Sequence, residues 1–295
     1  MWKRSDDMMT FEQWLVEEGK APATIQSYTT DVRQYEVYYE KQGLEEEVHL
    51  SRFLFNRYQV HLQKQGYAIA TLNKKVNSLK VWNDYLVEIG KMEKVCIHLA
   101  KDQITTAQGS EKEVTVLTEE QVEQFLFYLE RKQVSLRNKL IGYLLLYTGV
   151  RVSELVQVKL QDIDELMSTI QVVGKRQKLR EIPLRNEVLA CVKAYLKEER
   201  NQHPHRESPY LLLSQRAPKM HRDAVRSWLK QVGETVGFHL HPHLFRHTFA
   251  TRLLNKGVDL VTVSHLCGHT SVNMTMKFYI HISQKQKKQA IYKVI

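Results

Sequence analysis

Apolar and polar residues alternate with a helical period over the first 90 residues of the chain, and no part of this stretch has a strand pattern. Four segments carry apolar side chains three and four positions apart, which places them on one face of an α-helix. Glycines and an acidic loop separate the segments, as is usual between helices. The pattern predicts a four-helix domain over residues 1–92 with these apolar positions: Phe11, Trp14, Leu15, Ile25, Tyr28, Val32, Tyr35, Tyr38, Phe53, Leu54, Tyr58, Leu62, Leu72, Val76, Leu79, Trp82 and Leu86.

The helical period is lost over residues 93–115, where Lys, Gln, Thr, Ser and Gly accumulate, and an exposed linker is predicted there. A second domain is predicted over residues 116–281. It opens with a capping box from Thr118 to Gln121. An apolar run over 136–148 predicts a buried central helix that ends at Gly149.

The same domain contains the clearest strand pattern of the chain. Residues 169–173 are a short run rich in β-branched residues, 174–177 form a turn, and 178–183 are the return strand of a predicted β-hairpin. The fold class is therefore predicted as mainly α, with an N-terminal four-helix domain and an α-rich domain that holds a small hairpin or sheet. Further helices are predicted at about 119–132, 186–200, 221–235, 243–256, 259–267, 271–279 and 282–293, and residues 210–213 are a candidate strand.

Composition limits the class of protein. A chain of 295 residues with 43% hydrophobic and 26% charged residues is typical of a globular protein with two domains. No apolar run has membrane-spanning length, and the first residues lack the hydrophobic segment of a signal peptide. The three cysteines, Cys96, Cys191 and Cys267, are far apart and odd in number, which predicts no disulfide framework. A cytoplasmic protein without membrane partners is expected.

The net charge of +10 is unevenly distributed along the chain. Residues 1–110 hold 14 Lys and Arg against 15 Asp and Glu, whereas the remainder holds 29 against 18. A basic C-terminal two-thirds favours a polyanionic partner, nucleic acid before membrane, although a basic surface without a partner stays open. The candidate contacts with the DNA backbone are Lys74, Lys75 and Lys80 on the fourth helix, and Arg176, Lys178 and Arg180 on the hairpin.

The candidate chemistry begins at Pro242, a residue well suited to the first turn of a helix. His243 and Arg246 then lie three positions apart, so their side chains share one helix face and suit a phosphate. The pair alone is weak evidence for a phosphate site, because an arginine and a histidine at this spacing are usually only solvated. Arg151 between two helices, Lys175 on the hairpin, His269 and Tyr279 complete a set that suits phosphoryl transfer to a tyrosine.

The same residues also have simpler interpretations. Tyr279 is one of 14 tyrosines, and only its position after Gly268 and His269 distinguishes it from a core aromatic. Four histidines at positions 239, 241, 243 and 247, with Cys267, do not match the spacing of known metal ligands, so no metal site is predicted.

Five motifs in this order resemble the tyrosine recombinase (phage integrase) family, and the likeness covers nearly the whole chain. The motifs are TGVRVSEL at 148–155, GKRQKLREIPL at 174–184, PHLFRHTFAT at 242–251, LCGH at 266–269 and FYIH at 278–281. Cys267 stands where the family usually has leucine, and Arg176 and Gln177 replace a commoner glycine and asparagine. A buried cysteine is a tolerable apolar substitute, and neither departure weakens the assignment.

The resemblance implies a role for each matching residue. Arg151 and Arg246 would clamp the scissile phosphate, and His269 would bond to it. Tyr279 would be the nucleophile that forms a 3′-phosphotyrosyl bond. The remaining roles fall to Lys175, which would protonate the leaving 5′ oxygen, to His243, which would exchange a proton with the nucleophile, and to Glu154, which would support the site without taking part in chemistry.

The resemblance further implies double-stranded DNA recombination sites as partners, a homotetramer on two sites and a Holliday junction, with no cofactor or metal. Residues 1–92 would be the core-binding domain, and the tail at 282–295 would dock on a neighbouring subunit unless it is a frayed terminus. The absence of an arm-binding domain before residue 9 favours resolution of transposon cointegrates or replicon dimers over integration and excision. A DNA-binding protein without chemistry and a relaxing enzyme similar to type IB topoisomerases are the rival functions.

Overall fold

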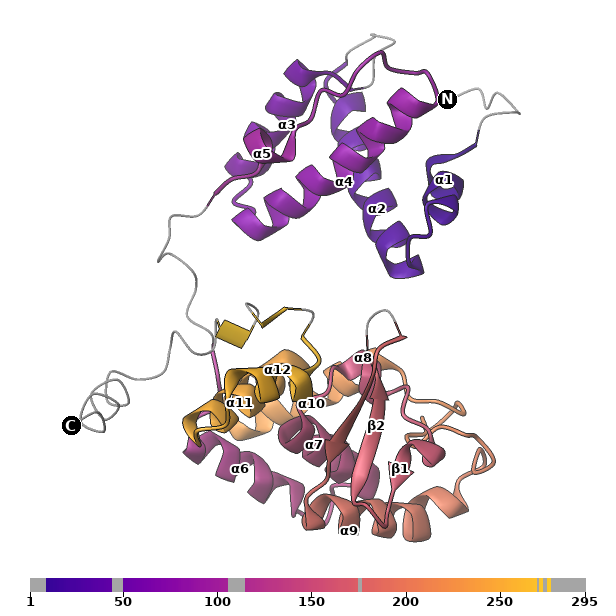
Figure 1. The fold of residues 1–295 in the computed structure, drawn as a ribbon, viewed down its shortest axis with the longest axis vertical. Helices are drawn as coiled ribbons and strands as arrows, with labels where there is room; N and C mark the ends of the chain where they lie inside the picture. The colour runs from indigo at the N-terminus through magenta and orange to yellow at the C-terminus, as the bar shows by residue number, and fades with distance from the viewer. Residues whose placement is uncertain are drawn as a thin grey trace, which may run out of the picture. The chain divides into compact units, whose positions relative to one another are not determined.

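The chain folds into two compact units, Met1–Glu111 and Lys112–Ile295, in a computed structural model (Figure 1). The structure describes residues 9–43, 50–105, 115–174, 177–269, 271–272 and 275–276. Each unit encloses its own apolar core. Among the described residues, no helix combines the length and apolar character needed to cross a membrane.

The first unit contains the four predicted helices. They are α1 (Phe11–Glu17), α2 (Pro22–Glu40), α3 (Arg52–Lys64) and α4 (Ile69–Glu88), and a short α5 (Leu99–Asp102) follows. Aromatic rings fill the core: the ring centroid of Tyr35 lies 5.1 Å from that of Tyr58 and 5.7 Å from that of Trp82. Helix α4 packs along α2, so the apolar stripes seen in the sequence face one another.

The exposed linker predicted from residue 93 is wrong for residues 93–105. Ile97 is fully buried in the first core, and the Oδ1 atom of Asn83 accepts hydrogen bonds from the backbone N–H groups of Cys96 and Ile97 at 2.8 and 3.1 Å. The Asn73 side chain accepts a hydrogen bond from the N–H of Ile104 and donates one to its carbonyl oxygen, both at 2.9 Å. Side-chain amides of α4 thus satisfy backbone groups that flank the short helix α5 in this segment. Residues 106–114 lie outside the described part.

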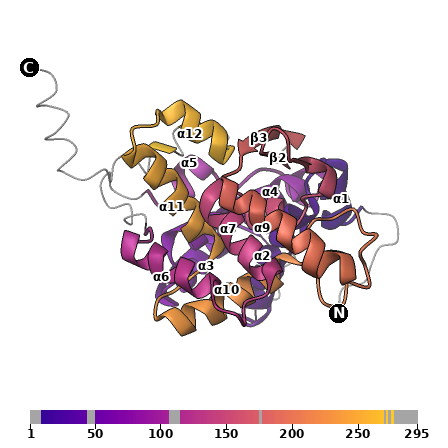
Figure 2. The same ribbon diagram turned by 90° about the horizontal axis from the view of Figure 1, so that it is seen from below.

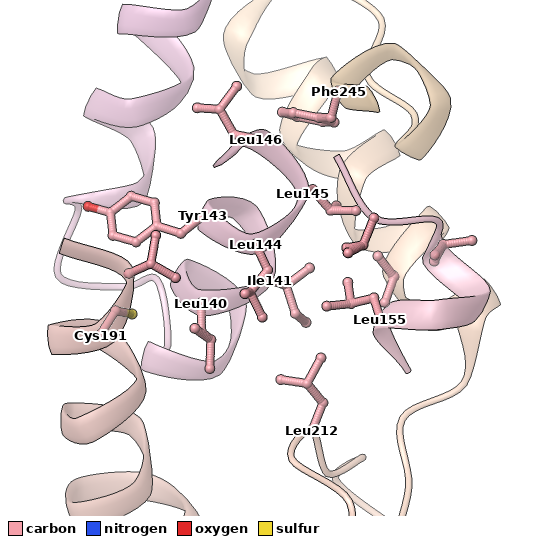
Figure 3. Close-up of a cluster of buried hydrophobic side chains, with 14 of the residues drawn as sticks. Leu140, Ile141, Tyr143, Leu144, Leu145, Leu146, Leu155, Cys191, Leu212 and Phe245 are labelled. Atoms are coloured by element: carbon pink, nitrogen blue, oxygen red, sulfur yellow. The ribbon is translucent and has the colours of Figure 1, made fainter. Parts of the chain in front are cut away.

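The second unit surrounds one apolar helix, α7 (Leu136–Thr148), which packs against α9 (Asn186–Ala194) and α11 (Pro242–Asn255) (Figure 2). Figure 3 shows side chains of α7 among Leu155, Leu212 and Phe245, with Tyr143 on the side of α7 where Cys191 of α9 lies. The predicted central helix is therefore confirmed. The remaining helices are α6 (Glu119–Leu129), α8 (Val152–Leu155), α10 (Arg222–Val236) and α12 (Leu260–Cys267), with single turns at Leu160–Asp162, Tyr195–Glu199 and Arg200–Gln202.

A three-stranded antiparallel sheet in the order β1-β2-β3 contains the predicted hairpin. Its strands are β1 (Ile163–Asp164), β2 (Thr169–Val173) and β3 (Leu179–Pro183), and Ile170 pairs with Ile182 in the hairpin register. The strand β1 was not predicted, because two residues are too few for a periodic signal. The candidate strand at 210–213 is wrong: only Tyr210 forms a bridge, to Lys159, within a buried loop. Most of the predicted helix at 271–279 and all of that at 282–293 lie outside the described residues.

Candidate active site

The first candidate arginine is fixed by a tight junction between two helices. Gly149 ends α7 in the left-handed conformation with φ of 60°, and a Cβ atom there would lie 2.4 Å from the ring of Phe249 on α11. Only glycine permits this approach. Arg151 follows two residues later at the N-cap of α8, so α7 and α11 together determine where its backbone lies.

Arg151 is held by the buried carboxylate of Glu154. Its backbone N–H donates to Oε2 at 2.8 Å and its Nη1 to Oε1 at 2.7 Å, while Nη2 donates to the carbonyl oxygen of Gly268 at 2.9 Å. Burial acts to raise the pKa of Glu154, but hydrogen bonds from Arg180 and from the Arg151 backbone hold the pKa below its usual value. Glu154 is therefore an anion at neutral pH. The Arg151 side chain keeps 26% of its surface exposed, so it remains accessible to a ligand.

Arg246 lies deeper, on α11. It is only 4% exposed, and its Nη1 donates to the carbonyl oxygen of Gly149 at 2.8 Å. Its Nη2 is buried and has no hydrogen-bond partner among the described residues. Burial lowers the pKa of Arg246 to about 10, so the guanidinium stays charged at neutral pH. A buried cationic donor without an acceptor is costly, and a bound anion would satisfy it.

The candidate histidines lie around these two arginines. His243 is exposed in the first turn of α11, and burial of part of its ring, followed by Arg246 and Arg151, lowers its pKa. His269 directly follows Gly268, and its Nδ1 lies 2.6 Å from the hydroxyl of Thr275. Burial and then the charges of Arg246 and Arg151 lower the pKa of His269 to about 4. Both imidazoles are therefore neutral at pH 7.

The neighbouring histidines have structural surroundings. His241 caps α11, since its Nδ1 accepts the backbone N–H of Leu244 at 3.2 Å. Burial lowers the pKa of His247 to about 4, and the ring interacts with the backbone of Thr115. Within the described part of the chain, no group of three His, Cys, Asp or Glu residues is arranged to hold a metal ion.

Three of the predicted site residues, Lys175, Arg176 and Tyr279, lie outside the described residues. The strands β2 and β3 precede and follow Lys175, and the N–H of Gly174 donates to the carbonyl oxygen of Lys178 at 2.8 Å. A Cβ atom on Gly174 would lie 3.6 Å from Oε1 of Glu154, so the hairpin turn begins beside that carboxylate. Sequence neighbours of Lys175 thus reach the site.

Two of the predicted DNA contacts are wrong. Lys75 is buried, and its Nζ lies 3.2 Å from Oδ1 of Asp31 and also contacts Gln34. Arg180 is only 10% exposed at its side chain, where it pairs with Glu154. Both had a signal in the sequence. Lys75 is spaced with Leu72 and Leu79 on the apolar stripe of α4, and Arg180 precedes buried Ile182 by two positions on β3, which places both on one face of the strand. Lys74 and Lys178 are exposed and Lys80 is half-buried.

Comparison with known proteins gives one family. Residues 115–286 match the model described as "Phage integrase family". The TnP I resolvase of Bacillus thuringiensis is 30% identical over 281 residues, which cover 94% of this chain and 96% of that protein. Tyrosine recombinase XerD of Listeria monocytogenes is 30% identical, with 95% and 94% covered, and tyrosine recombinase XerA of Pyrococcus furiosus is 30% identical, with 98% and 93% covered.

Solved structures share the fold. A XerH site-specific recombinase bound to palindromic difH substrate superposes with a TM-score of 0.77 at 22% identity, over 91% of this chain and 79% of that one. The Tn1549 transposon integrase in complex with a circular intermediate DNA gives a TM-score of 0.73 at 20% identity, over 98% of this chain and all of that one. The predicted fold class is confirmed.

Proposed function

Because this chain belongs to the phage integrase family and is a tyrosine site-specific recombinase, we propose that Arg151 and Arg246 bind the scissile phosphate of a double-stranded DNA recombination site. The observation that carries this proposal is the buried Nη2 of Arg246, a cationic donor that has no acceptor among the described residues. Guanidinium groups match the non-bridging phosphate oxygens and would offset the charge that develops on them during strand cleavage.

The proposed reaction transfers a phosphoryl group to a phenol. The Tyr279 oxygen attacks phosphorus as its proton passes toward His243, the bond from phosphorus to the 5′ oxygen breaks, and Lys175 protonates that oxygen. His269 is neutral because its pKa is about 4, so it can hydrogen-bond a phosphate oxygen without adding charge. The roles of Tyr279 and Lys175 are carried over from the family motifs, and Glu154 supports the site through Arg151.

Proposed contacts with the DNA backbone come from Lys74, Lys80, Arg176 and Lys178. The relatives solved as complexes with difH substrate and with circular intermediate DNA support DNA as the partner. We further propose a homotetramer that acts on two recombination sites in the cytoplasm. Residues 1–92 would be its core-binding domain, and the tail at 282–295 would dock on a neighbouring subunit.

The biological role proposed is resolution of cointegrates or replicon dimers, because a resolvase and Xer recombinases match over more than nine-tenths of their length. Integration and excision of an element is the alternative, and the transposon integrase fold supports it.

A nicked suicide substrate tests the chemistry. Such a DNA loses the short fragment that carries the attacking 5′-hydroxyl, so the covalent intermediate accumulates. The chain is expected to form an adduct that resists detergent and maps to Tyr279 by mass spectrometry, whereas Tyr279→Phe forms none. Tyr210→Phe is the matched control, because it removes a phenol oxygen elsewhere in the same unit. An adduct on another residue, or an undiminished adduct with Tyr279→Phe, would refute the proposal.

The same material separates the rival functions. A protein that only binds DNA would give no adduct with any substrate. A relaxing enzyme would remove supercoils from a plasmid without a recombination site and would give no crossed-over products. A plasmid that carries two sites is expected to yield two circles with the wild-type chain, because resolution joins strands from different sites.

A further inference from the structure

Arg180 is a cation whose side chain is only 10% exposed, in a strand whose other charged residue, Glu181, is exposed. Its side chain makes three hydrogen bonds to two other elements. Nη1 and Nη2 donate to the two carboxylate oxygens of Glu154 on α8 at 3.1 and 2.7 Å, and Nε donates to the carbonyl oxygen of Leu266 on α12 at 2.9 Å. A forked arginine with both carboxylate oxygens as acceptors is a geometrically demanding arrangement.

These bonds close a ring with those of Arg151. Glu154 accepts from both arginines, and both also donate to the end of α12, Arg180 to Leu266 and Arg151 to Gly268. Each arginine therefore contacts the same carboxylate and the same helix end from a different side. The residue after Gly268 is His269, so the ring fixes the backbone from which that imidazole extends.

Packing at Gly268 shows how closely Arg180 fits. A Cβ atom on Gly268 would lie 2.7 Å from Nη1 and 2.9 Å from Cζ of Arg180, and the φ of Gly268 is already 61°. The guanidinium thus occupies the space that any other side chain at position 268 would need. The glycine that precedes His269 is explained by Arg180 as well as by the helix end.

We propose that Arg180 is a positioning residue for strand cleavage, which acts on the phosphate through Glu154 and Arg151 and does not contact DNA. This inference rests on the proposed function of Arg151. Arg180 donates a hydrogen bond to each carboxylate oxygen of Glu154. Glu154 therefore accepts only one hydrogen bond from the Arg151 guanidinium, through Nη1, and orients it while the donors not bonded to Glu154 or Gly268 stay available for the phosphate. Without Arg180, Glu154 is free to turn and take both ends of the Arg151 guanidinium, which withdraws them from the phosphate.

Arg180 also connects the hairpin to the helices of the site. Arg180 lies on β3, on the return arm of the hairpin that carries Lys175, and its bonds join that arm to α8 and α12. The placement of the hairpin and the orientation of Arg151 are therefore linked by one side chain. A change in the hairpin that displaces Arg180 would disorder the phosphate site at the same time.

Single-turnover cleavage of the suicide substrate tests the proposal with Arg180→Met and Arg180→Lys. Loss of the fork is expected to slow covalent adduct formation roughly 100-fold in Arg180→Met, as for other misplacements of reacting groups. Arg180→Lys keeps the charge that Glu154 needs for folding, and its rate should fall between those of Arg180→Met and the wild type. DNA affinity should stay within about twofold in both, since Arg180 is buried away from the solvent. Arg185→Met, which removes an exposed cation after the same strand, is the matched control and should cleave at the wild-type rate.

A neutral substrate distinguishes positioning from damage to the fold. A methylphosphonate at the scissile position lacks one charged oxygen, so cleavage depends less on the arginine that offsets that charge. The rate penalty of Arg180→Lys should shrink on this substrate in parallel with that of Arg151→Lys. In the double variant, the Arg180 substitution should add little to the loss caused by Arg151→Lys. Equal penalties on both substrates, additive losses, or wild-type rates in folded Arg180 variants would overturn the proposal.

The proposed function is tested separately by the wild type and Arg151→Ala. If the wild type forms the adduct and Arg151→Ala is defective, the phosphate-binding role of Arg151 stands whatever the Arg180 variants do. If the wild type forms no adduct, the proposed function is refuted and the inference falls with it.

Discussion

Each unit of the molecule buries one carboxylate beside two cations, and the two clusters differ in what remains unsatisfied. In the first unit, Asp31 accepts from Lys74 at 2.9 Å, from Lys75 at 3.2 Å and from the hydroxyl of Ser78 at 2.7 Å. In the second, Glu154 pairs with Arg151 and Arg180. A buried ion pair is therefore no mark of an active site by itself.

The difference lies in the neighbours of each carboxylate. Lys75 directs its amine to Asp31 and Gln34 and is enclosed by the core of α2 and α4. Beside the second cluster, Arg246 buries Nη2 with no acceptor among the described residues. The first arrangement is complete without a ligand and ties two helices together. In the second, one buried hydrogen-bond donor lacks an acceptor among the residues that the structure describes, as is expected of an anion-binding site without its ligand.

The largest effect is expected from Arg246→Met. Removal of one cationic donor from the phosphate should slow single-turnover cleavage about 1000-fold, or about 4 kcal/mol of transition-state stabilisation. The free energy of unfolding in urea should fall by only about 1 kcal/mol, because the substitution removes the hydrogen bond to Gly149 together with a buried donor that has no partner in the described part of the chain. If the free energy of unfolding fell by as much as the transition-state stabilisation, Arg246 would have a structural role like that of Lys75, which would contradict its assignment as a ligand-binding group.

A smaller effect, on stability and not on cleavage, is expected from Asp31→Asn. The change leaves the buried amine of Lys75 without its counter-charge and should lower the free energy of unfolding by about 3 kcal/mol. Asp84→Asn breaks a more exposed pair with Lys80 and should cost less than about 1 kcal/mol. Cleavage per folded molecule should change little in either variant. A selective loss of cleavage in folded Asp31→Asn would show that the first cluster also serves the reaction.

The smallest expected effect is the loss of stability of the second unit in mild acid. Burial lowers the pKa of His247 and of His269 from the ordinary 6.5 to about 4, so the unfolded chain binds more protons than the folded chain between these pH values. The stability of the second unit should therefore fall as pH drops below 6.5, by about 1 kcal/mol for each histidine at pH 5.5. In the first unit, burial acts to raise the pKa of Asp31, but Ser78 and the two lysines lower it below 3.8. The stability from this carboxylate is thus present at pH 5.5 and lost only in stronger acid.

Urea unfolding at pH 7 and 5.5 measures this difference with His247→Asn. The variant should lose less stability on acidification than the wild type. Identical pH dependence in His247→Asn and the wild type would contradict the burial of a neutral imidazole.

Regular elements could be predicted from the sequence because their signals are local. The capping box at Thr118, the apolar run of α7 and the left-handed glycine at its end all lie within a few residues of the structure they produce. The hairpin was predicted for the same reason. The ordered segment at 93–105 was not, because its hydrogen bonds come from Asn73 and Asn83 on another element.

Charged residues were harder to assign. The motifs identified Arg151, Glu154, His243, Arg246 and His269, and the structure brings these residues to one place, while Lys175 and Tyr279 stay predictions. The two wrong assignments, Lys75 and Arg180, followed from the general rule that cations are exposed. Their buried partners lie 44 residues away at Asp31 and 26 residues away at Glu154. Only the periodicity of α4 and the alternation of β3 could have revealed them.

One hydrogen bond at the entrance of the second unit has a mechanical consequence. The backbone N–H of Leu117 donates to the hydroxyl of Thr248 at 2.9 Å, and that hydroxyl donates to the carbonyl oxygen of Leu244 at 2.8 Å. Thr248 is two residues from Arg246 on α11. A displacement of the backbone at Leu117 would therefore act first on α11, the helix that carries His243 and Arg246.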